Sequence, residues 1–142
     1  MPNTQVTPDR IRAFMIDRGP EDNFLLDDVE MDTKSIQTAM QMVIDKFATI
    51  PPLITESYTV ESFPYGAELV MGTAGYLLFM KGMNLTRNRL QHQSASGTAV
   101  DDKSRSEIYI NLGRQMIDEC MNNLRQIKQH LNIESGYLYL GG

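Results

Sequence analysis

Acidic side chains near the start of the chain are the first candidates for metal chemistry. Asp27, Asp28, Glu30 and Asp32 lie close together, and carboxylate oxygens are the ligands that calcium prefers. The run lacks the central glycine and the closing bidentate Glu of a calcium-binding loop. We therefore interpret it as a solvated loop followed by the charges of a helix start, and we expect no bound metal ion.

Histidine and serine side chains are the next candidates, for metal binding or nucleophilic catalysis. Neither His92 nor His130 belongs to an H-E-x-x-H or similar ligand pattern. Ser94, Ser96 and Ser104 have no base near them in a recognisable order. We therefore expect no catalytic residue and no enzymatic activity.

Cys120 is the only cysteine, which excludes an internal disulfide and every multi-cysteine metal site. Its position on an apolar helix face predicts an inert core thiol. The glycines between residues 66 and 82 fall inside a predicted helix and not between a strand and a helix. They therefore form no phosphate-binding loop, and no cofactor is expected.

Basic side chains flank a polar loop at residues 91–100. Arg87 and Arg89 lie late in one predicted helix, and Lys103 and Arg105 open the next. Two interpretations remain open for this basic rim. It is either the ordinary solvated ends of two helices, or a patch for an acidic neighbouring subunit or for DNA passing nearby.

The end of the chain, SGYLYLGG, is apolar where chain ends are usually polar. Tyrosine is favoured at protein interfaces, and an alternation of Tyr and Leu suits an extended segment. We predict that residues 134–142 form an extended tail that docks on a partner. Tyr137, Leu138, Tyr139 and Leu140 would make the contacts. In the alternative, the tail folds back on its own bundle.

One long apolar helix carries the glycines, Arg87 and Arg89. It is predicted to open near Ser62–Pro64 and to run to about Arg89, with Glu68 and Lys81 as its only charges between Ala67 and Met83. A helix that is apolar all round is buried on all sides, either by its own chain or by neighbouring subunits. Its apolar part is shorter than a membrane span.

Gly72 and Gly75 share one face of this helix. Glycine inside a helix costs about 1 kcal/mol relative to alanine. We predict that close approach of another helix or of a neighbouring subunit compensates for that cost.

The remaining elements are also helical. Thr7 and Pro8 start a short helix that Gly19 and Pro20 stop. A second helix starts at Asp32 or Thr33 and ends by Ile50, with apolar residues in helical register at Ile36, Ala39, Met40, Val43, Ile44 and Phe47. A fourth starts at Asp101 or Asp102 and runs to about Ile133, with a heptad-like row at Gly113, Ile117, Cys120, Leu124, Ile127 and Leu131.

The predicted fold class is therefore all-α. We expect a bundle of about four helices, two of them long and antiparallel, with extended N- and C-terminal segments. Residues 1–142 form one domain, with the bundle at about residues 7–133.

Composition narrows the classes of function. The net charge of −5 argues against a dedicated nucleic-acid binder. The 10 methionines suit adaptable packing between helices and between subunits.

Several ordered strings resemble a known class of protein. They are D-x-x-P-E-D-N-x-L-L-D-D-V-E at Asp17–Glu30, the Pro-Pro break after the second helix, F-P-Y before a glycine-containing apolar helix, N-R-L, and V-D-D-K at Val100–Lys103. Across residues 14–133 the chain resembles small virion structural proteins of tailed bacteriophages, of the neck or head-to-tail adaptor (connector) type.

The resemblance implies a subunit of a ring of twelve copies below the portal protein, in the neck of the virion. Such a ring extends the DNA channel, lets DNA pass without sequence-specific binding, and carries a further neck or tail protein. The chain would be made in the host bacterial cytoplasm, with no membrane contact. The alternatives are another neck or tail-completion protein, or a soluble regulatory helical domain that binds a peptide or small ligand between the third and fourth helices.

Overall fold

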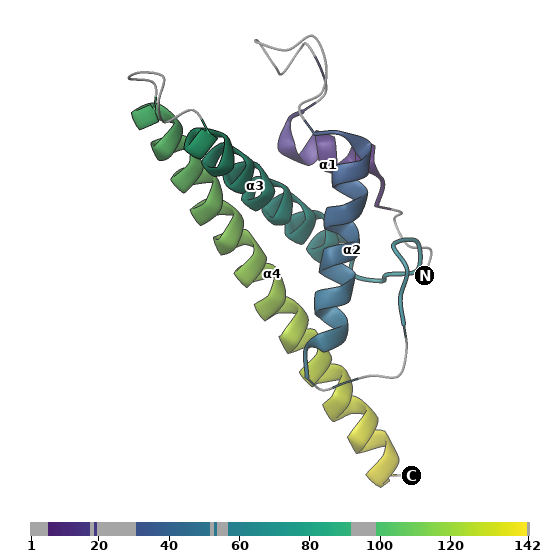
Figure 1. Ribbon diagram of the computed structural model, residues 1–142. Helices are drawn as coiled ribbons and strands as arrows, with labels where there is room; N and C mark the ends of the chain where they lie inside the picture. The colour runs from purple at the N-terminus through teal and green to yellow at the C-terminus, as the bar shows by residue number, and fades with distance from the viewer. Residues whose placement is uncertain are drawn as a thin grey trace.

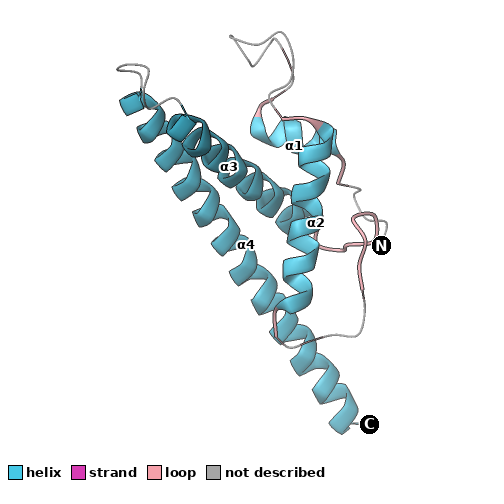
Figure 2. Ribbon diagram, in the orientation of Figure 1, coloured by secondary structure: helices cyan, strands magenta, loops and turns pink. Residues whose placement is uncertain are grey.

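A computed structural model describes residues 6–17, 19, 31–51, 53, 57–91 and 99–141. The helices are α1 (Pro8–Met15), α2 (Thr33–Thr49), α3 (Gly66–Gln91) and α4 (Ala99–Gly141). Figure 2 shows that the described residues form helices and loops with no strand. The prediction of an all-α fold is confirmed.

The two long helices, α3 and α4, form an antiparallel hairpin (Figure 1). α2 crosses the hairpin near the start of α3, and α1 packs beside the first turns of α2. The C-terminal end of α4 extends beyond the other helices (Figure 1). The frame is therefore a helical hairpin that α1 and α2 cover on one side only.

The starts of α1 and α2 follow the capping residues of the sequence. The Thr7 side chain accepts a hydrogen bond from the Arg10 amide at 3.2 Å, and the Asp32 carboxylate accepts one from the Ser35 amide at 2.6 Å. Each bond satisfies an amide that has no partner inside the helix. α1 ends at Met15, earlier than the predicted stop at Gly19.

The core lies between α2 and the first half of α3. Every apolar position predicted for α2 is buried: Ile36, Ala39, Met40, Val43, Ile44 and Phe47. From α3, the side chains of Leu69, Val70 and Leu77 are buried against them. An edge-to-face contact between Phe47 and Phe63, at 5.2 Å between ring centres, closes one end of the core.

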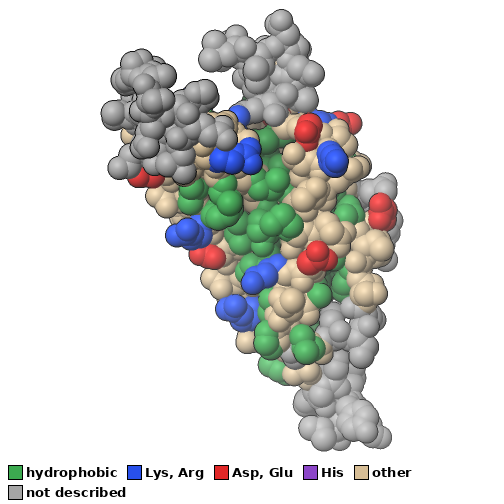
Figure 3. Space-filling view, in the orientation of Figure 1, with side chains coloured by type: hydrophobic (Ala, Val, Ile, Leu, Met, Phe, Trp, Pro, Cys, Tyr) green, Lys and Arg blue, Asp and Glu red, His purple; other side chains and the backbone are tan. Residues whose placement is uncertain are grey.

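Of the two predicted ways of burying α3, complete enclosure by its own chain does not hold. Leu78 and Phe79 are only half-buried, and Met83 is 54% exposed. Figure 3 shows hydrophobic side chains gathered over α3, between α4 and α2. The chain has too few helices to enclose α3 on every side, so part of its apolar surface meets solvent.

Two predicted boundaries also differ. α3 begins at Gly66 and not at Ser62–Pro64, because Thr59 and Ser62 form hydrogen bonds with each other in a turn.

α4 continues through residues 134–141, which were predicted to be extended. This stretch has no proline, and each added residue gains a helical hydrogen bond. That gain outweighs the cost of Gly136.

Candidate interaction surfaces

Glycine allows the backbones of α3 and α4 to touch. A Cβ atom built on Gly113 would lie 2.6 Å from the Gly75 carbonyl oxygen and 2.7 Å from the Phe79 amide nitrogen. A Cβ atom on Gly75 would lie 3.0 Å from the Gly113 carbonyl oxygen. Gly75 therefore faces α4 of its own chain, and the hairpin has no groove at this level.

Gly72 occupies a different environment. A Cβ atom there would meet the Cys120 sulfur at 2.8 Å and a Val43 methyl carbon at 2.9 Å. Gly72 thus lies where α2, α3 and α4 meet. Both predicted close-contact glycines face helices within the chain.

A row of apolar side chains on α4 points away from the core. Ile108 is 63% exposed and Leu112 is 45% exposed, and Met116 continues the row at half-burial. Residues four apart in a helix lie on the same face. The structure leaves this α4 row of Ile108, Leu112 and Met116 largely uncovered.

A second apolar group lies at the end of α1. Phe14 is 51% exposed, and Ile16 is exposed in the left-handed backbone region with φ 53°. That region is unfavourable for a β-branched residue. No sequence pattern indicated this conformation, because Gly19 was expected to end the helix.

The predicted basic rim is described only in part. Arg87 and Arg105 are both exposed near the end of the hairpin where α3 connects to α4, while the side chains of Arg89 and Lys103 lie outside the described residues. Between the two helices, the Thr86 and Ser106 hydroxyls bond each other at 2.6 Å. This bond fixes the relative position of the helices that carry Arg87 and Arg105.

The predicted docking residues Tyr137, Leu138, Tyr139 and Leu140 lie in α4 by their backbone, and their side chains lie outside the described residues. The prediction of an extended tail is wrong. Successive residues in a helix are about 100° apart, so these four residues are placed around the helix and not on two opposite faces.

The acidic and histidine candidates form no metal site in the described part of the chain. Asp32 serves as the cap of α2, and the hydrogen bonds from Ser35 lower its pKa. His130 is exposed on α4. No group of three or more metal-binding side chains occurs among the described residues, and Asp27, Asp28, Glu30 and His92 lie outside them.

Cys120 is fully buried, and its thiol donates a hydrogen bond to the Glu68 carbonyl at 3.2 Å. Burial, together with the negative charge of Glu68, raises the pKa of this thiol to about 12. A thiol that stays protonated is a poor nucleophile.

Lys128 is the polar group that sequence reasoning missed. It lies on α4 with only 1% of its surface exposed. Its ammonium group donates to the backbone carbonyls of Phe47 and Ile50, at the end of α2. Burial lowers the pKa of this lysine. A basic residue four positions after the buried Leu124 was the available signal, because that spacing places it on the inner face.

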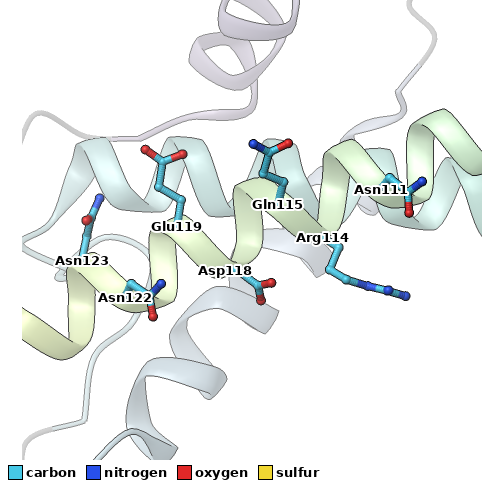
Figure 4. A pocket seen from close by; sticks show the side chains of 7 residues that line it. All are labelled: Asn111, Arg114, Gln115, Asp118, Glu119, Asn122 and Asn123. Carbon is cyan, nitrogen blue, oxygen red and sulfur yellow. The ribbon is translucent and has the colours of Figure 1, made fainter.

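A polar depression lies on the outer side of α4 (Figure 4). All of its lining side chains come from this one helix: Asn111, Arg114, Gln115, Asp118, Glu119, Asn122 and Asn123. Figure 4 shows Gln115 and Glu119 pointing to one side of the helix and Arg114 to another. With a single wall, the depression does not enclose a ligand.

No known protein family matches this chain, and neither does any curated protein or solved structure. In the described part of the chain, none of the helices has the length and hydropathy that crossing a membrane would require.

Proposed function

We propose that this chain is a structural subunit of a tailed-phage neck, which assembles into a ring beneath the portal and extends the DNA channel. The proposal rests on the sequence strings described above and on one structural observation. A closely packed helical hairpin carries apolar side chains that its own chain leaves uncovered.

The hairpin has the properties of an assembly element. The glycine contact between Gly75 and Gly113 locks its two helices together. Ile108, Leu112 and Met83 remain exposed on its outer surface. Exposed apolar surface of this kind marks sites of protein–protein contact. Neighbouring subunits of a ring would bury these side chains.

Charge supports a passive DNA conduit. The chain carries a net charge of −5, and a ring of negative subunits repels DNA enough to let it slide. Arg87 and Arg105 are exposed at the end of the hairpin where α3 connects to α4, and there they suit an acidic neighbour. This arrangement favours a structural role over sequence-specific DNA binding.

The alternative of a regulatory domain relied on a ligand groove between α3 and α4. The backbone contact between Gly75 and Gly113 fills that space. The contact therefore leaves no room for a peptide or small ligand at the level of Gly75 and Gly113.

The proposal is tested by locating the chain in particles. Virions purified from cells that express the chain with an affinity tag should retain it through a density gradient, and particle imaging should place it at the neck. Free tag expressed in the same cells is the control. Particles that assemble and infect normally without the chain would contradict the proposal.

A second test concerns the end of α4. Removing residues 136–142 should leave a folded chain, because the core side chains that the structure describes all come from earlier residues. The same truncation should weaken neck assembly if this end docks on the adjoining ring. Circular dichroism of the free protein measures folding, and particle imaging measures assembly.

A further inference from the structure

We propose that the free protein pairs with a second copy of itself through the α4 row, with the two α4 helices antiparallel about a two-fold axis at Leu112. The proposal concerns the chain before assembly. A two-fold contact closes at two copies and does not build a ring, so the pair must separate before neighbouring subunits of a ring bury Ile108 and Leu112.

The side chains around Leu112 form a symmetric pattern. Ile108 and Met116 lie four residues before and after Leu112. Arg105 and Glu119 lie seven residues before and after it. These spacings place all five residues on one side of the helix, over a length of about 21 Å.

Charge selects both the partner and the orientation. Arg105 and Glu119 are exposed, and neither makes an ion pair within the described part of the chain. In an antiparallel pair, Arg105 of each copy meets Glu119 of the other. Ile108 meets Met116 in the same way, and Leu112 meets itself. A parallel pair would instead bring like charges together.

The α4 row lies on the side of the hairpin that α2 leaves open. Lys128 marks the side of α4 that contacts α2, and Leu112 lies roughly 160° around the helix from it, at about 100° per residue. No contact with α2 therefore competes for the α4 row.

α3 widens the same surface. A Cβ atom on Gly113 would lie within 3.1 Å of the Phe79 backbone, so residues 78 and 79 lie level with Leu112. Leu78 is half-buried, and it lies on the flank of α3 opposite to the one that Gly72 turns toward α2. Two such hairpins would pack as a four-helix bundle.

The test uses charge reversal on the full chain. Arg105→Glu and Glu119→Arg should each weaken dimerisation roughly tenfold or more, because each variant alone places like charges at both ends of the contact. Mixing the two variants should restore dimers, since each substituted side chain then meets an opposite charge on its partner. Sedimentation equilibrium over a concentration series measures the dissociation constants.

Matched controls are available on another side of α4. Arg114→Glu and Asp118→Arg change exposed charges of the same kind and should leave dimerisation unchanged. The proposal is overturned if the wild-type chain is monomeric at every concentration. It is also overturned if the charge reversals change the dissociation constant no more than the controls do. The same holds if the mixture of the two variants forms no dimers. Retention in virions is measured separately, so either proposal can fail alone.

Discussion

The side-chain nitrogen of Lys128 on α4 lies 4.3 Å from the centre of the Phe47 ring on α2. The same nitrogen donates to the backbone carbonyl of Phe47 and, at 2.8 Å, to that of Ile50. The last carbonyls of a helix have no partner inside it. One buried lysine therefore caps the end of α2 and ties it to α4.

The variant Lys128→Met tests this tie. Methionine keeps most of the volume but removes both hydrogen bonds of the ammonium group and leaves the Phe47 carbonyl with only the Ile50 amide, so the free energy of unfolding should fall by about 1–3 kcal/mol. Lys46→Met is the control, because Lys46 is exposed in the last turn of α2 and should change stability by less than about 0.5 kcal/mol. Urea unfolding followed by circular dichroism gives both values. If both variants lose the same free energy of unfolding, Lys128 does not cap α2.

The variant Gly113→Ala tests the contact between the backbones of α3 and α4. The new methyl group would meet backbone atoms of Gly75 and Phe79 that cannot move aside alone, and overpacking of this kind costs about 1–3 kcal/mol. Asn111→Ala on the exposed side of α4 should instead be neutral or stabilising, because alanine is the better helix former. Thermal unfolding of both variants measures the difference. A stabilised Gly113→Ala protein would show that the helices are not in contact there.

The hydroxyl group of Thr73 is fully buried and has no hydrogen-bond partner among the described residues. Thr73→Val replaces it with a methyl group of similar size and should raise the free energy of unfolding by about 1 kcal/mol or more. Thr86→Val is the matched control. The Thr86 hydroxyl bonds the Gly82 carbonyl and Ser106, so its loss should destabilise the protein. If chemical denaturation shows that Thr73→Val is less stable than Thr86→Val, the Thr73 hydroxyl group is not unpaired.

Ile16 adopts φ 53° at the end of α1. The left-handed region costs an L-residue about 1–2 kcal/mol, and an Ile16 side chain that is 63% exposed contributes little burial. Ile16→Gly should therefore raise the melting temperature. Ala13→Gly, within α1 and also exposed, should lower it, because glycine weakens a helix interior. If both glycines destabilise the protein equally, Ile16 is not strained.

Cys120 makes stability depend on alkaline pH. Its pKa is about 12 in the folded chain against 9.0 as the ordinary value, so between these values the folded state keeps a proton that the unfolded chain loses. The contribution to stability is complete below pH 9.0 and is lost as pH rises toward about 12. The slope is at most about 1.4 kcal/mol per pH unit.

The variant Cys120→Ala should show a shallower loss of stability over this range than the wild type, measured by urea unfolding at successive pH values. A thiol reagent should also react with the native protein only as fast as it unfolds. Rapid reaction at neutral pH, or parallel pH curves for the two proteins, would show that the thiol is accessible.

Local chemistry was sufficient to predict the first two helix starts and the core face of α2. Thr7 and Asp32 satisfy amides within their own first turns, and the spacing from Ile36 to Phe47 repeats with the helical period. Such features depend on neighbours along the chain, so the sequence contains them. It could not predict how far α4 extends, because Tyr and Leu alternation suits a strand and fits a helix equally well.

Features that join distant segments required the tertiary structure. Lys128 is charged, so the sequence alone predicts a surface residue. Only the tertiary structure shows that the end of α2 lies beside it. Ile108 and Leu112 are apolar and share one helix face, but α2 packs on the other side of the hairpin and leaves them exposed. A sequence determines which face of a helix is apolar. The fold decides whether another helix of the same chain covers that face, because burial depends on what packs there in space.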